Sequence, residues 1–589
     1  MLRIFKHLTK KDVILIVLIV GLVVVQSWLE ITIPNLIGQM TYSLVNYGAD
    51  SIIGSILSTG GLMLGAAFGS LIAAIVSVWL STKIAAGFAA RVRGKIFAKV
   101  DSFSATEVNK FSPASLITRT TNDVQRVQMF LAMGVRLFVR APVTAIWALT
   151  VMGTRNWEFI IVVAIALFIM VAMVTFLVVM ALPKFKKVQA LTDDINRLTR
   201  ENLSGIRVVR AYNAQSFQEE KFEKANSEMV KTNLFVERAF NIMMPGMLMI
   251  IGAVSLGITL VAAFLIYGAD GNIAMQAELV SNMLEFSQLS VLVIMSFVMM
   301  IIIFATMPRA IVSGKRILEV LETELTIVDG AGVEVQDENL GKVEFKNVSF
   351  KYPDAEGYVL QDISFSALKG ETVAFIGSTG SGKSTLINLV PRFYDVTEGE
   401  IFVNGAPVVD YKLNELSKQI GYVSQRGVIF NSTIKENIAF GQVGEDMQDD
   451  DIHAAISTAQ ADDFVSKLDD GINSATAQGG TNLSGGQKQR VSIARALAKK
   501  APILIFDDSF SALDYKTDKA LRDALSKEAA NTTKLIVAQR IGTILDADQI
   551  LVLDKGMVVG KGTHKELLAS CEVYKEIAYS QLSKEELGV

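Results

Sequence analysis

Cysteine is nearly absent from this sequence, and neither sign of charge is in excess. The 589 residues include a single cysteine, Cys571, which excludes an intramolecular disulfide and suits a reducing compartment, where we expect a packing role. The formal net charge is −3, and the basic residues are segregated along the chain and do not form one patch. We therefore expect no nucleic-acid partner.

A cleavable signal peptide is not indicated either. The N-terminal residues 1–11 lead into an apolar run that is too long for a signal-peptide core and shows no small-residue cleavage site. We expect a retained first membrane span, preceded by a short amphipathic segment on the cytoplasmic surface.

Long apolar runs, in contrast, are abundant. Hydrophobic residues make up 51% of the chain and the mean hydropathy is +0.40, which exceeds the usual globular share, and 589 residues are too many for one core. Several stretches are near or above the roughly 20 residues that cross a hydrocarbon core. We predict an all-α transmembrane domain with six spans at residues 12–40, 52–82, 132–153, 158–182, 241–267 and 279–307.

The loops between these spans differ in charge. The short loops after spans one, three and five offer only Arg155, whereas the two long loops carry many lysines and arginines. By the positive-inside rule, both long loops and both termini face the cytoplasm, so we predict a multi-pass protein of the cytoplasmic membrane. The long loops keep a helical period, at Val188, Leu191, Ile195 and Leu198 for example, which predicts helices that run past the bilayer.

The glutamates and the methionines inside the spans each allow two interpretations. Glu30 and Glu285 are costly in lipid, so they are either functional or lie toward the outer surface within reach of water, and their positions favour the second interpretation. Methionines either line a substrate path or fill gaps, and we favour gap filling. They gather in Met243–Met249 and at Met295, Met299, Met300 and Met307. Pro245 and Gly246 predict a kink in the fifth span.

Near residue 325 the pattern changes from apolar helices to strand-like alternation with turn signals. We therefore divide the chain into a transmembrane domain, residues 1–325, and an α/β domain, residues 326–589, with its core at about 343–578.

The α/β domain contains a P-loop pattern between an apolar run, 373–376, and a helix-like segment, 386–390. Its glycines let backbone N–H groups close around phosphates, Lys383 reaches the outer phosphates, and Ser384 can ligate Mg²⁺. The alternative is a Gly-rich turn without a ligand, but a Lys-Ser pair has no packing purpose there. The predicted ATP-binding residues of this loop are Gly377, Ser378, Thr379, Gly380, Ser381, Gly382, Lys383, Ser384 and Thr385.

Two further segments carry phosphate or metal chemistry. Leu483–Gln487 heads a helix, with Ser484 as a good N-cap and two glycines that let the backbone approach a phosphate. Residues 501–508 read as a buried parallel strand that ends in two carboxylates, where ligands bind in such sheets. Tyr352 precedes the P-loop and Gln425 follows it, and together with the other motifs they resemble the order found in an ABC nucleotide-binding domain. The whole chain resembles a half-transporter of the six-helix ABC exporter type.

The resemblance implies a role for each motif. Tyr352 would stack on adenine, although a core tyrosine is an alternative; Gln425 would bind Mg²⁺ and the attacking water, and Asp507 would hold Mg²⁺ together with Ser384. Asp514 resembles the D-loop residue that crosses between sites. The signature would close on ATP held by the other subunit of a dimer, and it consists of Leu483, Ser484, Gly485, Gly486 and Gln487.

The tips of the two long loops, residues 110–123 and 207–222, resemble the coupling helices that contact nucleotide-binding domains in such exporters. They read alternatively as solvated helical hairpins.

Two positions depart from the family pattern. The residue after Asp507 is Asp508, where the family has the glutamate general base, and Gln539 replaces the switch histidine. Asp is one methylene shorter than Glu, and Gln cannot carry a proton or a positive charge, so this chain's own site is predicted to bind ATP well and hydrolyse it poorly. An intact signature beside a degenerate site is typical of one subunit of a heterodimeric exporter.

The sequence therefore predicts ATP-driven efflux of amphipathic drugs or lipid-like compounds across the cytoplasmic membrane by a heterodimer with a second ABC half-transporter. Two alternatives stay open. The chain forms a homodimeric peptide or lipid exporter, or it is an ATP-binding regulatory subunit without a transport path.

Overall fold

The computed structural model describes residues 3–46, 49–269, 271–442 and 447–583, and it divides the chain into two compact units. The helical unit comprises residues 1–99 and 114–323, and the α/β unit comprises residues 100–113 and 324–589. Parts of the predicted short loops after the first and fifth spans, residues 47–48 and 270, lie outside the described residues. The compact units do not correspond to two continuous segments, since residues 100–113 pack with the α/β unit. The predicted division into functional domains near residue 325 therefore stays a prediction.

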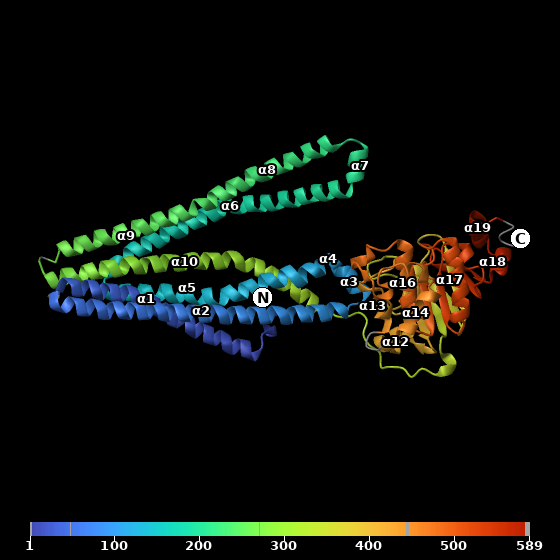
Figure 1. Ribbon diagram of the computed structural model, residues 1–589. Helices are drawn as coiled ribbons and strands as arrows, with labels where there is room; N and C mark the ends of the chain where they lie inside the picture. The colour runs from blue at the N-terminus through green and yellow to red at the C-terminus, as the bar shows by residue number, and fades with distance from the viewer. Residues whose placement is uncertain (1–2, 47–48, 270, 443–446, 584–589) are drawn as a thin grey trace. The chain divides into compact units, whose positions relative to one another are not determined.

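The helical unit consists of long helices and their short connections (Figure 1). Its elements are η1 (Ile4–His7), α1 (Lys10–Asn46), α2 (Ala49–Asp101), α4 (Pro113–Thr118), the π-helical turn η2 (Arg119–Asp123), α5 (Val124–Arg155), α6 (Trp157–Ser204), α7 (Ile206–Ala211), α8 (Gln215–Asn241), α9 (Met243–Tyr267) and α10 (Ile273–Leu321). Among the described residues, 6 helical stretches are long and apolar enough to cross a membrane, which confirms the predicted spans.

Several of these helices are far longer than a bilayer is thick. The 53 residues of α2 rise roughly 80 Å at 1.5 Å per residue, against a hydrocarbon core of about 30 Å. The prediction that helices run past the bilayer is therefore confirmed. α6 and α8 form a hairpin with α7 at its tip (Figure 1). α8 and α9 break at Ile242, three residues before Pro245, where the sequence predicted a kink.

Two acidic side chains inside the helical unit are paired with arginines of α5. Both oxygens of Glu30 accept from Arg140 Nη2 at 2.9 Å, and Glu285 accepts from Arg155 Nη1 at 2.5 Å. The Glu285 side chain is only 1% exposed, so the expectation that water reaches it is wrong. The structure gives both carboxylates a partner charge, which lowers the cost of placing them in an apolar surrounding.

The α/β unit contains a parallel-centred sheet and an antiparallel one. The six-stranded sheet has the order β12-β11-β3-β10-β9-β6, in which only β12 is antiparallel, and the four-stranded sheet has the order β2-β1-β4-β5. The strands are β1 (Val343–Phe350), β2 (Leu360–Ala367), β3 (Thr372–Gly377), β4 (Glu398–Val403), β5 (Ala406–Pro407), β6 (Ile420–Val423), β9 (Ile503–Asp507), β10 (Thr533–Val537), β11 (Gln549–Asp554) and β12 (Met557–Gly562), with a small pair, β7 (Ser432–Thr433) and β8 (Ala475–Thr476).

Helices cover both faces of the six-stranded sheet because its central strands are apolar on both sides. In β3, Val373 and Phe375 enter one core, while Ala374 and Ile376 enter the other, as alternation along a strand requires. The α-helices of the whole unit are α3 (Ala105–Phe111), α11 (Lys383–Leu389), α12 (Leu413–Lys418), α13 (Ile434–Ala439), α14 (Asp449–Thr458), α15 (Asp462–Val465), α16 (Gly485–Ala498), α17 (Tyr515–Glu528), α18 (His564–Ser570) and α19 (Glu572–Gln581). Cys571 is buried, as its predicted packing role requires.

The first loop tip joins the α/β unit through a carboxylate. Glu107 of α3 accepts from the backbone N–H of Thr326 at 2.8 Å and from Ser104 Oγ at 2.5 Å. Burial alone would raise the pKa of Glu107, but these hydrogen bonds outweigh it and lower the pKa to about 2. The α3 segment is therefore tied to the chain that leaves α10, which explains why residues 100–113 belong to this unit.

Candidate functional site

The P-loop connects β3 to α11 and wraps around the ammonium group of Lys383. Lys383 Nζ donates to the carbonyl oxygens of Gly377 at 2.9 Å and Ser378 at 2.8 Å, and to Ser381 Oγ at 3.3 Å. A Cβ at Gly377 would lie 2.0 Å from the carbonyl oxygen of Leu553, so only glycine fits there. Burial lowers the pKa of Lys383, while the two aspartates opposite oppose this shift. The loop is thus closed around a cation at the helix N-terminus, a geometry suited to phosphate.

Two of the predicted metal ligands meet at the end of β9. Ser384 Oγ donates to Asp507 Oδ1 at 2.7 Å, across the edge where β9 and the P-loop end. Burial raises the pKa of Asp507, and the Ser384 hydrogen bond counteracts this. A hydroxyl and a carboxylate oxygen this close are donors that suit a hard cation such as Mg²⁺. The third predicted ligand, Gln425, belongs to the same pocket but contacts the neighbouring carboxylate.

Asp508 is held by two amide side chains. Its Oδ2 accepts from Gln539 Nε2 at 2.8 Å and, more weakly, from Gln425 Nε2 at 3.4 Å. Its backbone has φ = 48°, a left-handed conformation that is uncommon for a non-glycine residue and is typical of functional positions. Burial raises the pKa of Asp508, whereas hydrogen bonding lowers it. The residue that replaces the family's glutamate is thus directly bonded to the residue that replaces its histidine.

Most of these groups, but not Asp507, line one pocket of about 390 Å³ in the α/β unit. The lining includes Thr379, Gly380, Gly382, Lys383, Ser384 and Thr385 of the P-loop with Gln425, Asp508 and Gln539. Sequence reasoning therefore named side chains that lie together in space although up to 160 residues separate them. Among the described residues of this lining, none comes from the signature 483–487 or is Asp514, and their service to a second subunit's nucleotide stays a prediction.

Tyr352 lies beside the pocket in a cluster of rings. Its hydroxyl is 3.0 Å from Thr385 Oγ1, and its ring packs edge-on against Phe350 at 5.0 Å and Tyr394 at 5.2 Å. The Tyr394 hydroxyl accepts from Asn109 Nδ2 of α3 at 3.4 Å. Tyr352 is half-buried, so its position is compatible with both interpretations given above. Its ring can stack on adenine, or it can serve only as a core side chain.

The signature forms the start of α16. Ser484 caps the helix by accepting from Gln487 N–H at 3.3 Å, and Gln487 Oε1 accepts from Ser484 N–H at 2.8 Å, which completes a capping box. The predicted N-cap is therefore confirmed. In the part of the chain that the structure describes, a Cβ at Gly485 would meet no atom within 4 Å. Among the described residues, none therefore restricts this position to glycine, and the role of the signature in binding a second subunit's nucleotide stays a prediction.

The D-loop candidate has a local structural role as well. Asp514 caps α17 by accepting from Thr517 N–H at 3.0 Å, and these bonds lower its pKa. Arg540, next to Gln539, donates to the backbone oxygen of Ser511 at 3.3 Å. The loop after β9 and the loop after β10 are thereby braced against each other.

Comparison with known proteins places the chain in a family. The model described as "ABC transporter" matches residues 360–511, and "ABC transporter transmembrane region" matches residues 16–290. An uncharacterized ABC transporter ATP-binding protein of Mycobacterium tuberculosis is 35% identical over 530 residues, 90% of this chain and 89% of that protein. The chain belongs to the ABC transporter family. It is one half of an ATP-driven transporter, with a six-helix membrane part fused to a nucleotide-binding domain.

Two other proteins are similar to this ABC half-transporter, one in sequence and one in fold. An ATP-dependent lipid A-core flippase of Alkalilimnicola ehrlichii is 33% identical over 482 residues, 81% of this chain and 79% of that protein. A solved structure of a bacterial Atm1-family ABC exporter with ATP bound matches 98% of this chain and 99% of that one with a TM-score of 0.77 at 23% identity, which establishes the exporter fold.

Sequence reasoning missed several residues of this half-transporter. Arg136 and Arg140 are charges inside the predicted span 132–153, a signal that was available, and Arg140 is the partner of Glu30. Gln581 of α19 donates to the backbone oxygen of Gln539 at 2.8 Å and accepts from Ile541 N–H at 2.8 Å. No sequence signal marks Gln581, because its contacts arise only when α19 packs beside the loop after β10.

Proposed function

We propose that this half-transporter is the degenerate-site subunit of a heterodimeric exporter that moves amphipathic drugs or lipid-like compounds out of the cytoplasm. One observation carries the proposal: the Asp508 carboxylate, where a general base is needed, is bonded to Gln539 and Gln425 amides at 2.8 and 3.4 Å. Both amides donate to Oδ2, and a carboxylate oxygen held by two donors that cannot take up a proton is poorly placed to activate water.

In this proposal the chain's own residues bind ATP without cleaving it quickly. Lys383 and the P-loop amides hold the phosphates, Tyr352 supports the base, and Ser384, Asp507 and Gln425 would hold Mg²⁺, which neutralises phosphate charge when bound. Asp508 and Gln539 keep each other in place. The signature 483–487 completes the partner's site, where a glutamate and a histidine carry out hydrolysis.

Exposed apolar surfaces on both units support a partner subunit. At the hairpin tip of the helical unit, Val208 is 61% and Tyr212 80% exposed. In the α/β unit, Val428 is 52% exposed, and the stacked rings of Phe430 and Phe440 are 42% and 50% exposed. Apolar groups outside the membrane are costly in water, so each surface is expected to be covered in the assembled transporter.

The predicted division near residue 325, the cytoplasmic location of both termini and the coupling role of the loop tips belong to the same proposal. ATP bound between two nucleotide-binding domains would draw them together, and the long helices would convey this closure to the membrane part. The similarity to a lipid A-core flippase supports a lipid-like substrate.

The heterodimer is tested by comparing the purified chain alone with the chain coexpressed with the product of a neighbouring half-transporter gene. We expect the isolated chain to bind ATP but to turn it over at least about tenfold more slowly than the pair, because no complete catalytic site exists without the partner. Equal turnover by the chain alone, with only this polypeptide in the assembly, would contradict the proposal and favour a homodimeric flippase.

A further inference from the structure

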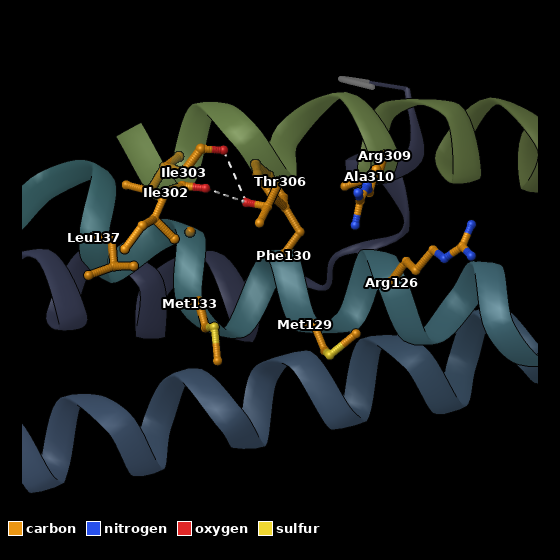
Figure 2. Close-up of a pocket in the computed structure, with 11 residues that line it drawn as sticks. Arg126, Met129, Phe130, Met133, Leu137, Ile302, Ile303, Thr306, Arg309 and Ala310 are labelled. Carbon is orange, nitrogen blue, oxygen red and sulfur yellow. Dashed lines mark hydrogen bonds between the residues drawn. The ribbon is translucent and has the colours of Figure 1, made fainter. Parts of the chain in front are cut away.

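A pocket in the helical unit lies between α5 and α10 and plays no part in the nucleotide chemistry (Figure 2). Its volume is about 280 Å³, near the lower end of small-molecule sites. Met129 and Met133 line it, whereas the methionines that gather at 243–249 and 295–307 do not. These two side chains are 50% and 61% exposed, so the pocket opens to its surroundings and is not a sealed void.

The pocket is polar at one end and apolar at the other. Figure 2 shows Arg126 of α5 and Arg309 of α10 at the same end, while Leu137 and Ile302 lie at the opposite end. Arg126, Met133 and Leu137 share a face of α5, since their spacing of seven and four residues follows the helical period. Along this face, Leu137 lies roughly 17 Å from Arg126 at 1.5 Å per residue.

The charge at the polar end is positive and only partly compensated. Asp123 lies 3.8 Å from Arg126 and 3.9 Å from Arg316, and it also accepts from Ser313 at 2.7 Å. In the part of the chain that the structure describes, Arg309 has no carboxylate within ion-pair distance. The one hydroxyl in the lining, of Thr306, donates to its own helix at 3.1 and 3.0 Å. The lining therefore offers two guanidinium groups, and the acid beside it, Asp123, is shared with Arg316 outside the pocket.

The position of this end along α5 matches the surface of a bilayer. Arg126 precedes Arg155, at the other end of α5, by 29 residues, or roughly 44 Å, which matches the about 40–45 Å thickness of a bilayer with both headgroup regions. The arginines therefore lie at headgroup level on the predicted cytoplasmic side, and the apolar end reaches into the hydrocarbon. A headgroup and its acyl chains have the same polarity and direction.

We propose that this pocket binds an anionic amphiphile from the cytoplasmic leaflet, a lipid with a phosphate-bearing headgroup, as the transported compound. The proposal rests on the exporter function proposed above and names its substrate class. Two guanidinium groups match a phosphate in charge and hydrogen-bond geometry, and basic pockets between membrane helices favour such headgroups. Met129, Met133 and Ile302 supply an apolar surface for an acyl chain. A cationic amphiphile would be repelled at the same end.

The test uses the purified full chain in nucleotide-free nanodiscs with photoreactive phosphatidylglycerol or phosphatidylcholine of identical acyl chains. We expect phosphatidylglycerol to label α5 and α10 peptides, and the double variant Arg126→Ala/Arg309→Ala to lower this labelling about tenfold or more, because each basic group near the surface contributes about 1 kcal/mol. Arg309→Lys should retain part of it. Lys315→Ala is the matched control, since it removes one exposed charge from α10 outside the pocket and should change nothing.

Equal labelling by the zwitterionic lipid, or labelling that the double variant leaves unchanged, would overturn the proposal. In the assembled transporter, ATP with vanadate should lower phosphatidylglycerol labelling, because the site then opens toward the other side of the membrane. Labelling that is the same with and without nucleotide would indicate a structural lipid and overturn the substrate assignment. Binding of a fluorescent ATP analogue reports that each variant is folded. The nucleotide-free labelling needs neither hydrolysis nor a partner. It can therefore succeed when the heterodimer test fails, and it can fail when the heterodimer test succeeds.

Discussion

The double variant Asp508→Glu/Gln539→His is expected to raise hydrolysis at this chain's own pocket by about 10²-fold. The longer glutamate brings a carboxylate toward the attacking water, and the histidine can carry the charge that Gln539 cannot. Both changes are needed because each residue holds the other, through the 2.8 Å bond between Gln539 Nε2 and Asp508 Oδ2. The measurement is the phosphate release rate of the assembled pair, with the partner's own site inactivated at its catalytic glutamate.

Two comparisons sharpen this prediction. The single variant Gln539→His in the Asp508 background should gain much less, since the carboxylate stays too short. Nucleotide affinity, measured with a fluorescent ATP analogue, should change little in either variant because the Lys383 cradle is untouched. A double variant that folds, binds ATP and remains as slow as the parent would show that something other than these two side chains limits the site.

The second large effect concerns the signature. Gly485→Ala is expected to reduce turnover of the assembled pair by about 10²-fold, because the added methyl group would hold the partner's nucleotide away from the amides at the start of α16. Lys383→Ala, in the chain's own P-loop, should lower turnover only about two- to threefold, since that site hydrolyses little. Steady-state ATPase rates of the two variant pairs test this asymmetry.

Gly485→Ala is a clean probe because a Cβ at this position meets no atom of the described residues within 4 Å. A loss of activity therefore reports on a contact outside this polypeptide. The matched control is Gly542→Ala, another glycine of the α/β unit whose Cβ would meet nothing, and it should leave the rate unchanged. Equal losses from Gly485→Ala and Lys383→Ala would mean that the two composite sites are equivalent.

Features set by local sequence were predictable. Apolar length alone indicates the membrane helices, and the P-loop, the Ser484 cap and the β9 strand depend on residues within a few positions of one another. The order of motifs then brought Gln425, Asp508 and Gln539 into one pocket, because the carboxyl ends of β6, β9 and β10 meet at one edge of the sheet.

Contacts that depend on the faces of helices were not predictable. Met129 lies before the predicted span 132–153 and Met133 near its start, and no local pattern indicates the pocket that this part of α5 forms with α10. The pairing of Glu285 with Arg155 joins residues that are 130 positions apart, and no local pattern signals it. The attachment of α3 through Glu107 to Thr326 has the same origin.

The central claim is that the pocket around Lys383 keeps its ATP while the partner's pocket cleaves its own. The most direct test is a single turnover of the purified pair loaded with one labelled ATP in each pocket, followed by counting the nucleotide that remains bound. We expect about half of the ATP to become ADP rapidly and the other half to stay intact, crosslinked to this chain when a photoreactive ATP is used. Rapid conversion of both nucleotides at the same rate would contradict the account.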